Sequence, residues 1–138
     1  MSQENVEIVL TQIEAFNAFM RGELSREAGA EILHPHIEVH WHEERTAGLP
    51  RDLRGAEALI AYAEERRNGL GGLEPLEFIE APDGRLVTPI RQEFRAPEGG
   101  VPLATHFFYV WTFRDGTVRH VEIYLRRADA LQAAGLPE

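Results

Sequence analysis

Two side chains of opposite charge, Arg91 and Glu93, are separated by one residue in a run that alternates like a β-strand. Alternate residues of a strand point to the same face, so these two side chains are expected to lie side by side. A carboxylate in such a pair can act as a general base, with the guanidinium orienting it. Such pairs are also found as structural ion pairs or at solvated strand edges. The sequence therefore makes Glu93 a candidate base and Arg91 its orienting partner, with a purely structural pair as the alternative.

Histidines follow one another at a spacing that could bind a transition metal: His34, His36, His40 and His42, before Glu43 and Glu44. Neutral imidazoles are ligands of zinc, iron and nickel. A metal site also needs a closed set of ligands, which this spacing alone does not supply. His40 and His42 alternate with Trp41, so they point to the opposite face of the strand. We therefore predict solvated or interface histidines and no metal, with a metal site as the alternative.

Aromatic residues are concentrated in two β-rich runs that flank Asp115 and Gly116. An Asp-Gly pair between two strand patterns is the strongest short signal for a β-hairpin. Phe107, Tyr109 and Trp111 alternate along the first run, so they are expected to share one face of the sheet. A surface of this kind either packs a core or lines a ligand pocket.

The elements that position these residues follow from the apolar periodicity. Apolar residues recur at steps of three and four from near Ser2 to near Gly22, which predicts an amphipathic helix. Ser25 can cap a second, short helix, and Pro35 ends it. The pattern then predicts a strand at 37–41, a charged loop at 43–53 and a third helix at 55–68. Two strands at 73–81 and 85–96 follow, then the two hairpin strands around 115–116 and a short C-terminal cover at 128–136.

Helices that are segregated from an antiparallel sheet make an α+β domain. The third helix has Leu59, Tyr62 and Ala63 on its buried side. A strongly twisted sheet with three helices on one face forms an open cone with an interior cavity. We therefore predict one α+β domain over residues 1–138, a cone-shaped barrel of three N-terminal helices on a curved, mostly antiparallel sheet. The predicted order is helix, helix, strand, helix and four strands.

Composition narrows the possible functions. The chain of 138 residues has no cysteine, which excludes disulfides and thiolate chemistry and fits a reducing cytoplasm. A net charge of −9 repels phosphate backbones, so nucleic acid is not an expected ligand. The first residues do not resemble a signal peptide, and no apolar run is long enough to cross a membrane. These features predict a cytoplasmic, soluble protein that does not bind membranes.

Several segments resemble the SnoaL-like group of the nuclear transport factor 2-like superfamily: 14–17, 33–36, 53–55, 110–116, 124–125 and 130–131. The resemblance spans nearly the whole chain and implies the cone fold, with a site inside the cone. Similar proteins include polyketide cyclases, ketosteroid isomerases, epoxide hydrolases, dehydratases and members with no chemistry. The fold thus indicates where a site lies, whereas the residues decide what it does.

The resemblance also implies roles for individual residues. The general base of ketosteroid isomerase-like relatives falls at Trp41, and an indole cannot accept a proton, which disfavours that mechanism. Their oxyanion-binding acid falls near Tyr109, whose phenol can still donate a hydrogen bond. Epoxide hydrolase-like relatives have an arginine and an aspartate that match Arg91 and Glu93, with glutamate in place of aspartate, but their second acid falls at Ile123. The resemblance places the Arg91 and Glu93 side chains on the concave face.

The predicted wall of the cone consists of Phe16, Trp41, Phe107, Trp111 and Ile123. We predict that the protein binds a small apolar molecule there, without a cofactor. One alternative is an isomerase-, cyclase- or epoxide hydrolase-like enzyme that uses Glu93 with Arg91 and Tyr109. A second alternative is a structural dimerisation module whose interior is simply packed.

The opposite face of the sheet predicts an assembly. The alternation places four apolar residues there: Phe108, Val110, Val118 and Tyr124. An apolar sheet face of this size is unfavourable in water. We therefore predict a homodimer that buries the outer sheet face of each copy.

Overall fold

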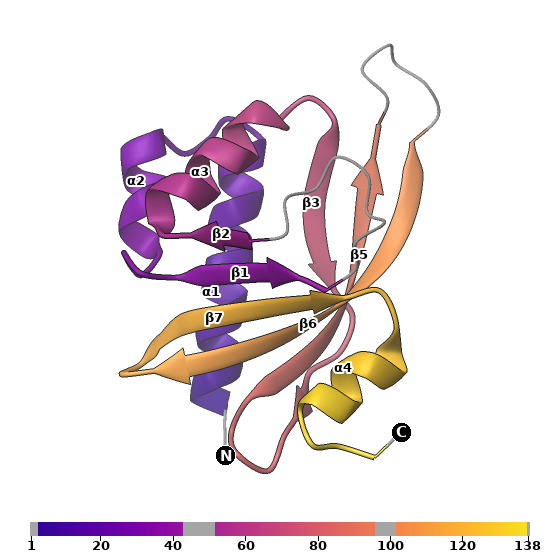
Figure 1. Ribbon diagram of the computed structural model, residues 1–138. Helices are drawn as coiled ribbons and strands as arrows, with labels where there is room; N and C mark the ends of the chain where they lie inside the picture. Colours follow the sequence, from indigo (N-terminus) through magenta and orange to yellow (C-terminus); the bar gives the residue numbers. More distant parts are fainter. Residues whose placement is uncertain (1–2, 43–51, 96–101, 138) are drawn as a thin grey trace.

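The computed structural model describes residues 3–42, 52–95 and 102–137 (Figure 1). Glu43 and Glu44, most of the predicted loop at 43–53 and the predicted turn at 97–100 lie outside these ranges. The described helices and strands are α1 Gln3–Met20, α2 Arg26–Ile32, β1 Glu38–Trp41, β2 Asp52–Arg54, α3 Ala56–Glu65, β3 Leu70–Pro75, β4 Ile79–Glu80, β5 Leu86–Phe94, β6 Leu103–Arg114, β7 Thr117–Tyr124 and α4 Arg127–Ala133. No helix in the described ranges is long and apolar enough to cross a membrane.

The strands form one sheet in the order β2-β1-β7-β6-β5-β3, and β4 pairs with β5 beside this path. All pairs are antiparallel except β1 with β7. The sheet curves around α1, and α2 and α3 complete the cover on that side (Figure 1). The predicted α+β fold, with three N-terminal helices on a curved and mostly antiparallel sheet, is confirmed. The barrel is not closed, because β2 and β3 remain at the two ends of the sheet.

Local sequence signals account for several element boundaries. The Ser25 hydroxyl accepts a hydrogen bond of 3.1 Å from the backbone N–H of Ala28, as expected for a helix N-cap. Asp115 and Gly116 both have positive φ, 54° and 77°, which matches the twist of a two-residue hairpin turn. The predicted hairpin of β6 and β7 therefore forms, and it brings the aromatic residues of β6 into the centre of the sheet.

Two parts of the predicted element order are wrong. The predicted strand at 73–81 is divided into β3 and β4, and Pro75, which lacks a backbone N–H, ends the first of them. The end of the predicted loop at 43–53 is β2, which pairs with β1 in the register Val39 to Leu53. Such a short strand is stabilised by its distant partner, which the local pattern does not reveal.

The sheet separates two apolar clusters. The larger one lies between the concave face and α1–α3, and it contains Phe107, Tyr109 and Trp111. The smaller one lies on the other face, where α4 covers Val110 and Phe108. Much of the outer apolar surface that predicted a homodimer is thus covered by the chain's own C-terminal helix.

Val118 was predicted to lie on the outer face of the sheet, but it lies on the inner face. The register of β6 and β7 shifts between Thr112 and Phe113, so that Phe113 pairs with Val118. A β-bulge of this kind moves the following side chains to the other face. Val118 is consequently buried in the larger, inner cluster.

Candidate ligand-binding cavity

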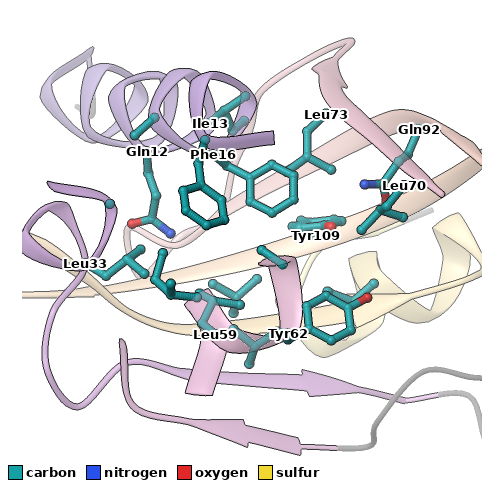
Figure 2. Close-up of a pocket in the computed structure, with 18 of the residues that line it drawn as sticks. Gln12, Ile13, Phe16, Leu33, Leu59, Tyr62, Leu70, Leu73, Gln92 and Tyr109 are labelled. Atoms are coloured by element: carbon teal, nitrogen blue, oxygen red, sulfur yellow. The ribbon is translucent and has the colours of Figure 1, made fainter. Parts of the chain in front are cut away.

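The inner cluster is not completely filled. A cavity of about 90 Å³ lies between the concave face of the sheet and α1–α3 (Figure 2). One water molecule occupies roughly 10–15 Å³, so the cavity has room for several waters or for a compact organic molecule. Its walls come from all three N-terminal helices and from β1, β3, β5, β6 and β7.

Each residue predicted for the wall lines this cavity: Phe16, Trp41, Phe107, Trp111 and Ile123. The pairing of the strands explains why they converge. Tyr109 is opposite Ile123 in the β6–β7 pair, and Trp41 is opposite Ile123 in the β1–β7 pair. Directly paired residues share a face of the sheet, so three strands contribute to one apolar wall.

Arg91 and Glu93 do not face the cavity, and the prediction of their orientation is wrong. Their neighbours Gln92 and Phe94 line the cavity instead. The β5–β6 register pairs Ile90 with Phe107, which places the even-numbered residues of this part of β5 on the concave face. Tyr109 is therefore separated by the sheet from the charged pair with which it was expected to act.

The pair forms a partly exposed ion pair on the convex face. Arg91 Nη1 is 3.2 Å from Glu93 Oε2 and 3.6 Å from Glu74 Oε1. The side chains of Arg91 and Glu93 are 38% and 45% exposed. Solvent screens charges at such positions, so this arrangement matches the structural alternative stated for the pair.

The polar groups in the cavity wall include two phenols. Tyr109 extends from β6, and Tyr62 extends from α3 (Figure 2). Burial raises the pKa of Tyr62 to about 12, while the charge of Arg66 acts in the opposite direction. Burial is also the main cause that raises the pKa of Tyr109, and the nearby Tyr62 adds to the effect. Both hydroxyls are therefore protonated at neutral pH and can donate hydrogen bonds.

Sequence reasoning placed Tyr62 on the buried side of its helix but did not recognise it as a site residue. Its signal was a hydroxyl on an otherwise apolar helix face, between Leu59 and Ala63. A buried hydroxyl normally needs a partner, and this requirement distinguishes tyrosine from phenylalanine at such a position. Only the fold shows that its ring reaches the same cavity as Tyr109.

Two further polar groups of the wall, those of Trp111 and Gln92, are already hydrogen-bonded. Trp111 Nε1 donates to Thr88 Oγ1 at 3.2 Å, and Gln92 Nε2 donates to the carbonyl oxygen of Gly71 at 3.0 Å. The described residues that line the cavity include no Asp, Glu, Lys, Arg or His. The wall thus combines an apolar surface with a few uncharged polar groups.

The helices leave part of the cavity accessible. Gln12 and Phe16 on α1, Leu33 after α2 and Leu59 on α3 are only half-buried, and Ile32 is 42% exposed. The lining residues of β1, β6 and β7 are buried. The opening therefore lies mainly among the three helices, with the strands as its floor.

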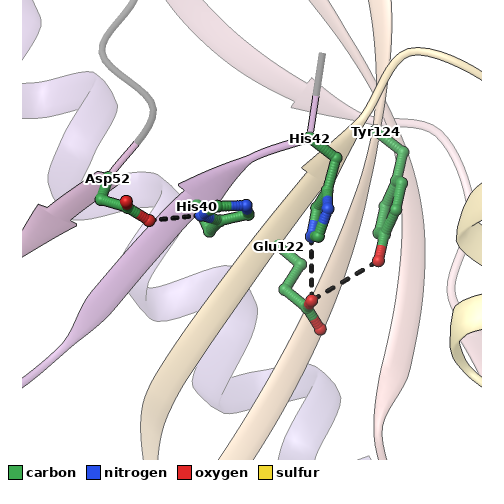
Figure 3. A network of polar contacts seen from close by, with 5 residues as sticks. All are labelled: His40, His42, Asp52, Glu122 and Tyr124. Carbon is green, nitrogen blue, oxygen red and sulfur yellow. Dashed lines mark hydrogen bonds and ion pairs between the residues drawn. The ribbon is translucent and has the colours of Figure 1, made fainter. Parts of the chain in front are cut away.

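The histidines at positions 40 and 42 lie on the outer face, as predicted (Figure 3). His40 Nδ1 contacts Asp52 Oδ1, and His42 Nε2 is 2.9 Å from Glu122 Oε1. The His42 ring stacks on Tyr124 with a centroid separation of 4.2 Å, and Tyr124 donates a hydrogen bond of 3.4 Å to Glu122. Within the described ranges, no three His, Cys, Asp or Glu side chains are grouped as a metal site would require.

The sequence matches no protein-family model and no curated protein. Solved structures do resemble the chain. One is an NTF2-like protein of unknown function from Burkholderia pseudomallei, at 23% identity and a TM-score of 0.67, with 97% of this chain and 98% of that chain covered. A second is TerC co-crystallised with polyporic acid, at 24% identity and a TM-score of 0.67, with 96% and 98% covered.

A third similar structure is SalBIII, an epoxide hydrolase/cyclase-like enzyme with a role in pyran ring formation in the polyether salinomycin. It is 18% identical, with a TM-score of 0.65 and with 94% of this chain and 97% of that chain covered. The molecule is an α+β cone with an apolar internal cavity. Its fold is the nuclear transport factor 2-like fold, as the sequence motifs predicted. This level of identity establishes the fold and leaves the activity to be argued from the cavity.

Proposed function

We propose that the protein binds a small, largely apolar molecule in the cavity between the sheet and α1–α3. The observation that carries this proposal is an unfilled, aromatic-walled space in the centre of the fold. Protein interiors are normally close-packed, and a concave, mostly apolar space with few polar groups is a common form of a ligand site. The unfilled space favours ligand binding over the alternative of a purely structural dimerisation module.

The composition of the wall also favours binding over the enzymatic alternative. Proton-transfer catalysis usually requires a carboxylate or an imidazole within reach of the substrate. The described lining residues contain neither, and Glu93 lies on the other side of the sheet. Isomerase- and cyclase-like proteins are among the structures with a similar fold, so turnover remains the second candidate function.

Intrinsic fluorescence provides a direct test. Both tryptophans of the chain, Trp41 and Trp111, line the cavity. Titration with ethylbenzene, a compact apolar probe, is expected to change their emission as the cavity fills and to raise the melting temperature with increasing probe concentration. Native mass spectrometry of the freshly purified protein identifies any ligand retained from the cell.

A matched pair of variants on α1 controls for effects outside the cavity. Ala15 lines the cavity, whereas Ala18 is also half-buried on the same helix but does not line it. Ala15→Phe is expected to fill part of the space and weaken ethylbenzene binding, and Ala18→Phe to leave it unchanged. Equal binding by wild type and a folded Ala15→Phe variant would contradict the cavity as the binding site.

A further inference from the structure

Two hydroxyl groups in the cavity have no hydrogen-bond partner among the described residues: those of Tyr62 and Tyr109. The residues themselves are 8% and 9% exposed. They belong to different walls, since Tyr62 is on α3 and Tyr109 is on β6. Neither hydroxyl oxygen is solvent-excluded, so both reach the open space of the cavity. A molecule that fills this space leaves the two phenols unpaired unless it accepts hydrogen bonds, so an occupant with an acceptor is favoured over one without.

Charged occupants are disfavoured by the same wall. A carboxylate ligand would find no cation among the described lining residues, and an ammonium ligand would find no carboxylate. The helices around the opening also carry exposed glutamates, among them Glu14, Glu31 and Glu57. With a net charge of −9 on the chain, this surface opposes the approach of anions.

Arg66 supports the phenol of Tyr62 without entering the cavity. Its Cζ lies 4.3 Å from the centroid of the Tyr62 ring, which is a cation–π distance. Arg66 is not part of the cavity lining. The guanidinium therefore packs on the ring and restricts its position, which reduces the entropy that the phenol loses when it binds an acceptor.

We infer that the ligand of this cavity is an uncharged, mainly apolar molecule with a hydrogen-bond acceptor, such as a ketone, ester or lactone carbonyl, held by Tyr62 and Tyr109. This inference rests on the proposed function, because it assumes that the cavity binds a ligand. It adds the chemical class of that ligand and assigns the two donors. The apolar body of the ligand contacts the aromatic wall, and its acceptor is directed to the phenols.

The test uses probes that differ in one group. Acetophenone and ethylbenzene have the same carbon skeleton and differ in a carbonyl, while benzoate and benzylammonium supply the two charges. Affinities are measured by calorimetry for wild type, Tyr62→Phe and Tyr109→Phe. Tyr124→Phe is the matched control, because Tyr124 is the third tyrosine of the chain and lies on the outer face.

Each cavity variant is expected to weaken acetophenone binding by about threefold to tenfold, which corresponds to the loss of one neutral hydrogen bond. Ethylbenzene binding is expected not to weaken in any of these variants, because ethylbenzene makes no hydrogen bond to the phenols, and this result also shows that each variant is folded. Tyr124→Phe is expected to change neither affinity. The charged probes are expected to bind more weakly than acetophenone.

The outcomes separate this inference from the proposed function. If ethylbenzene binds but the affinity for acetophenone is the same in wild type and both cavity variants, the inference is wrong and the binding function stands. Tighter binding of benzoate or benzylammonium than of acetophenone also overturns it. If no probe binds, the proposed function fails, and this inference fails with it.

Discussion

The side chain of Asn17 pairs with the backbone of Leu73 as a neighbouring strand would. Asn17 Nδ2 donates to the carbonyl oxygen of Leu73 at 3.0 Å, and the N–H of Leu73 donates to Asn17 Oδ1 at 2.7 Å. Leu73 belongs to β3, which is the last strand of the sheet on that side. One amide on α1 thus satisfies part of a free sheet edge and joins the helix to the wall of the cavity.

Replacing Asn17 by Ala is expected to lower the free energy of unfolding by roughly 1–3 kcal/mol, since it leaves two partly buried backbone groups of Leu73 without a partner. Asn5→Ala on the same helix removes one longer bond, from Asn5 Nδ2 to the carbonyl oxygen of Gly84 at 3.3 Å. Its expected effect is smaller, and urea unfolding measures both. Equal losses of unfolding free energy in the two variants would show that the paired hydrogen bonds to Leu73 stabilise the protein no more than the single bond of Asn5.

Gly72 is expected to tolerate no side chain while Asn17 is present. A Cβ atom at Gly72 would lie 2.8 Å from Asn17 Oδ1, which is closer than real contacts allow. Gly72→Ala therefore displaces the amide from Leu73 and destabilises the protein. In an Asn17→Ala background, Gly72→Ala is expected to lower the stability much less. Thermal unfolding of wild type, the two single variants and the double variant measures the coupling between the two positions. Additive effects would exclude the contact as the cause.

Stability is expected to fall at high pH because of the buried phenols. The pKa of Tyr62 is raised from 10.0 to about 12, so the folded state holds the proton more tightly than the unfolded chain. The contribution of protonated Tyr62 to the free energy of unfolding is complete below pH 10. It is lost as the pH rises towards 12, by up to about 2–3 kcal/mol. Tyr62→Phe is expected to flatten this part of the stability profile.

Ultraviolet absorbance of phenolate follows the same titration directly. Burial raises the pKa of Tyr109 as well, and the pKa of Tyr124 is raised to about 12. Little phenolate is therefore expected near pH 10 while the protein is folded. A full tyrosine titration near pH 10 in the folded protein would contradict the burial of these hydroxyls.

Glu93→Gln is expected to have little effect, because Arg91 and Glu93 form a partly exposed ion pair. The expected change in unfolding free energy is below about 1 kcal/mol. The affinity for ethylbenzene or acetophenone is expected to stay unchanged, since Glu93 does not line the cavity. A marked loss of ligand affinity in this variant would show that Glu93 contributes to the binding site.

A homodimer through the outer sheet face remains a prediction, now on a smaller surface because α4 covers Val110 and part of Phe108. Tyr124 also packs against the smaller apolar cluster on this face and is half-buried, whereas His42, which stacks on its ring, is exposed. Sedimentation equilibrium is expected to give twice the 15.6 kDa mass of the chain, and His42→Asp to weaken the association by adding a negative charge beside Glu122. A 15.6 kDa species at micromolar concentration would exclude the dimer.

The local sequence determined those features that depend on near neighbours. The N-cap at Ser25 and the turn at Asp115 and Gly116 follow from side-chain and backbone preferences within a few residues. Alternation along β6 placed Phe107 and Tyr109 on one face together. These signals, together with the resemblance to nuclear transport factor 2-like proteins, predicted the fold class and the aromatic residues that share the cavity wall.

Tertiary structure decided which face each strand presents. Alternation shows that Arg91 and Glu93 share a face, but a shift of one residue in register exchanges the faces, and the register depends on pairing with β6. The register shift after Thr112 likewise moves the Val118 side chain from the outer to the inner face of the sheet. Tyr62 joins Tyr109 in one cavity only because α3 packs over the concave face, a contact between segments that are far apart in the chain.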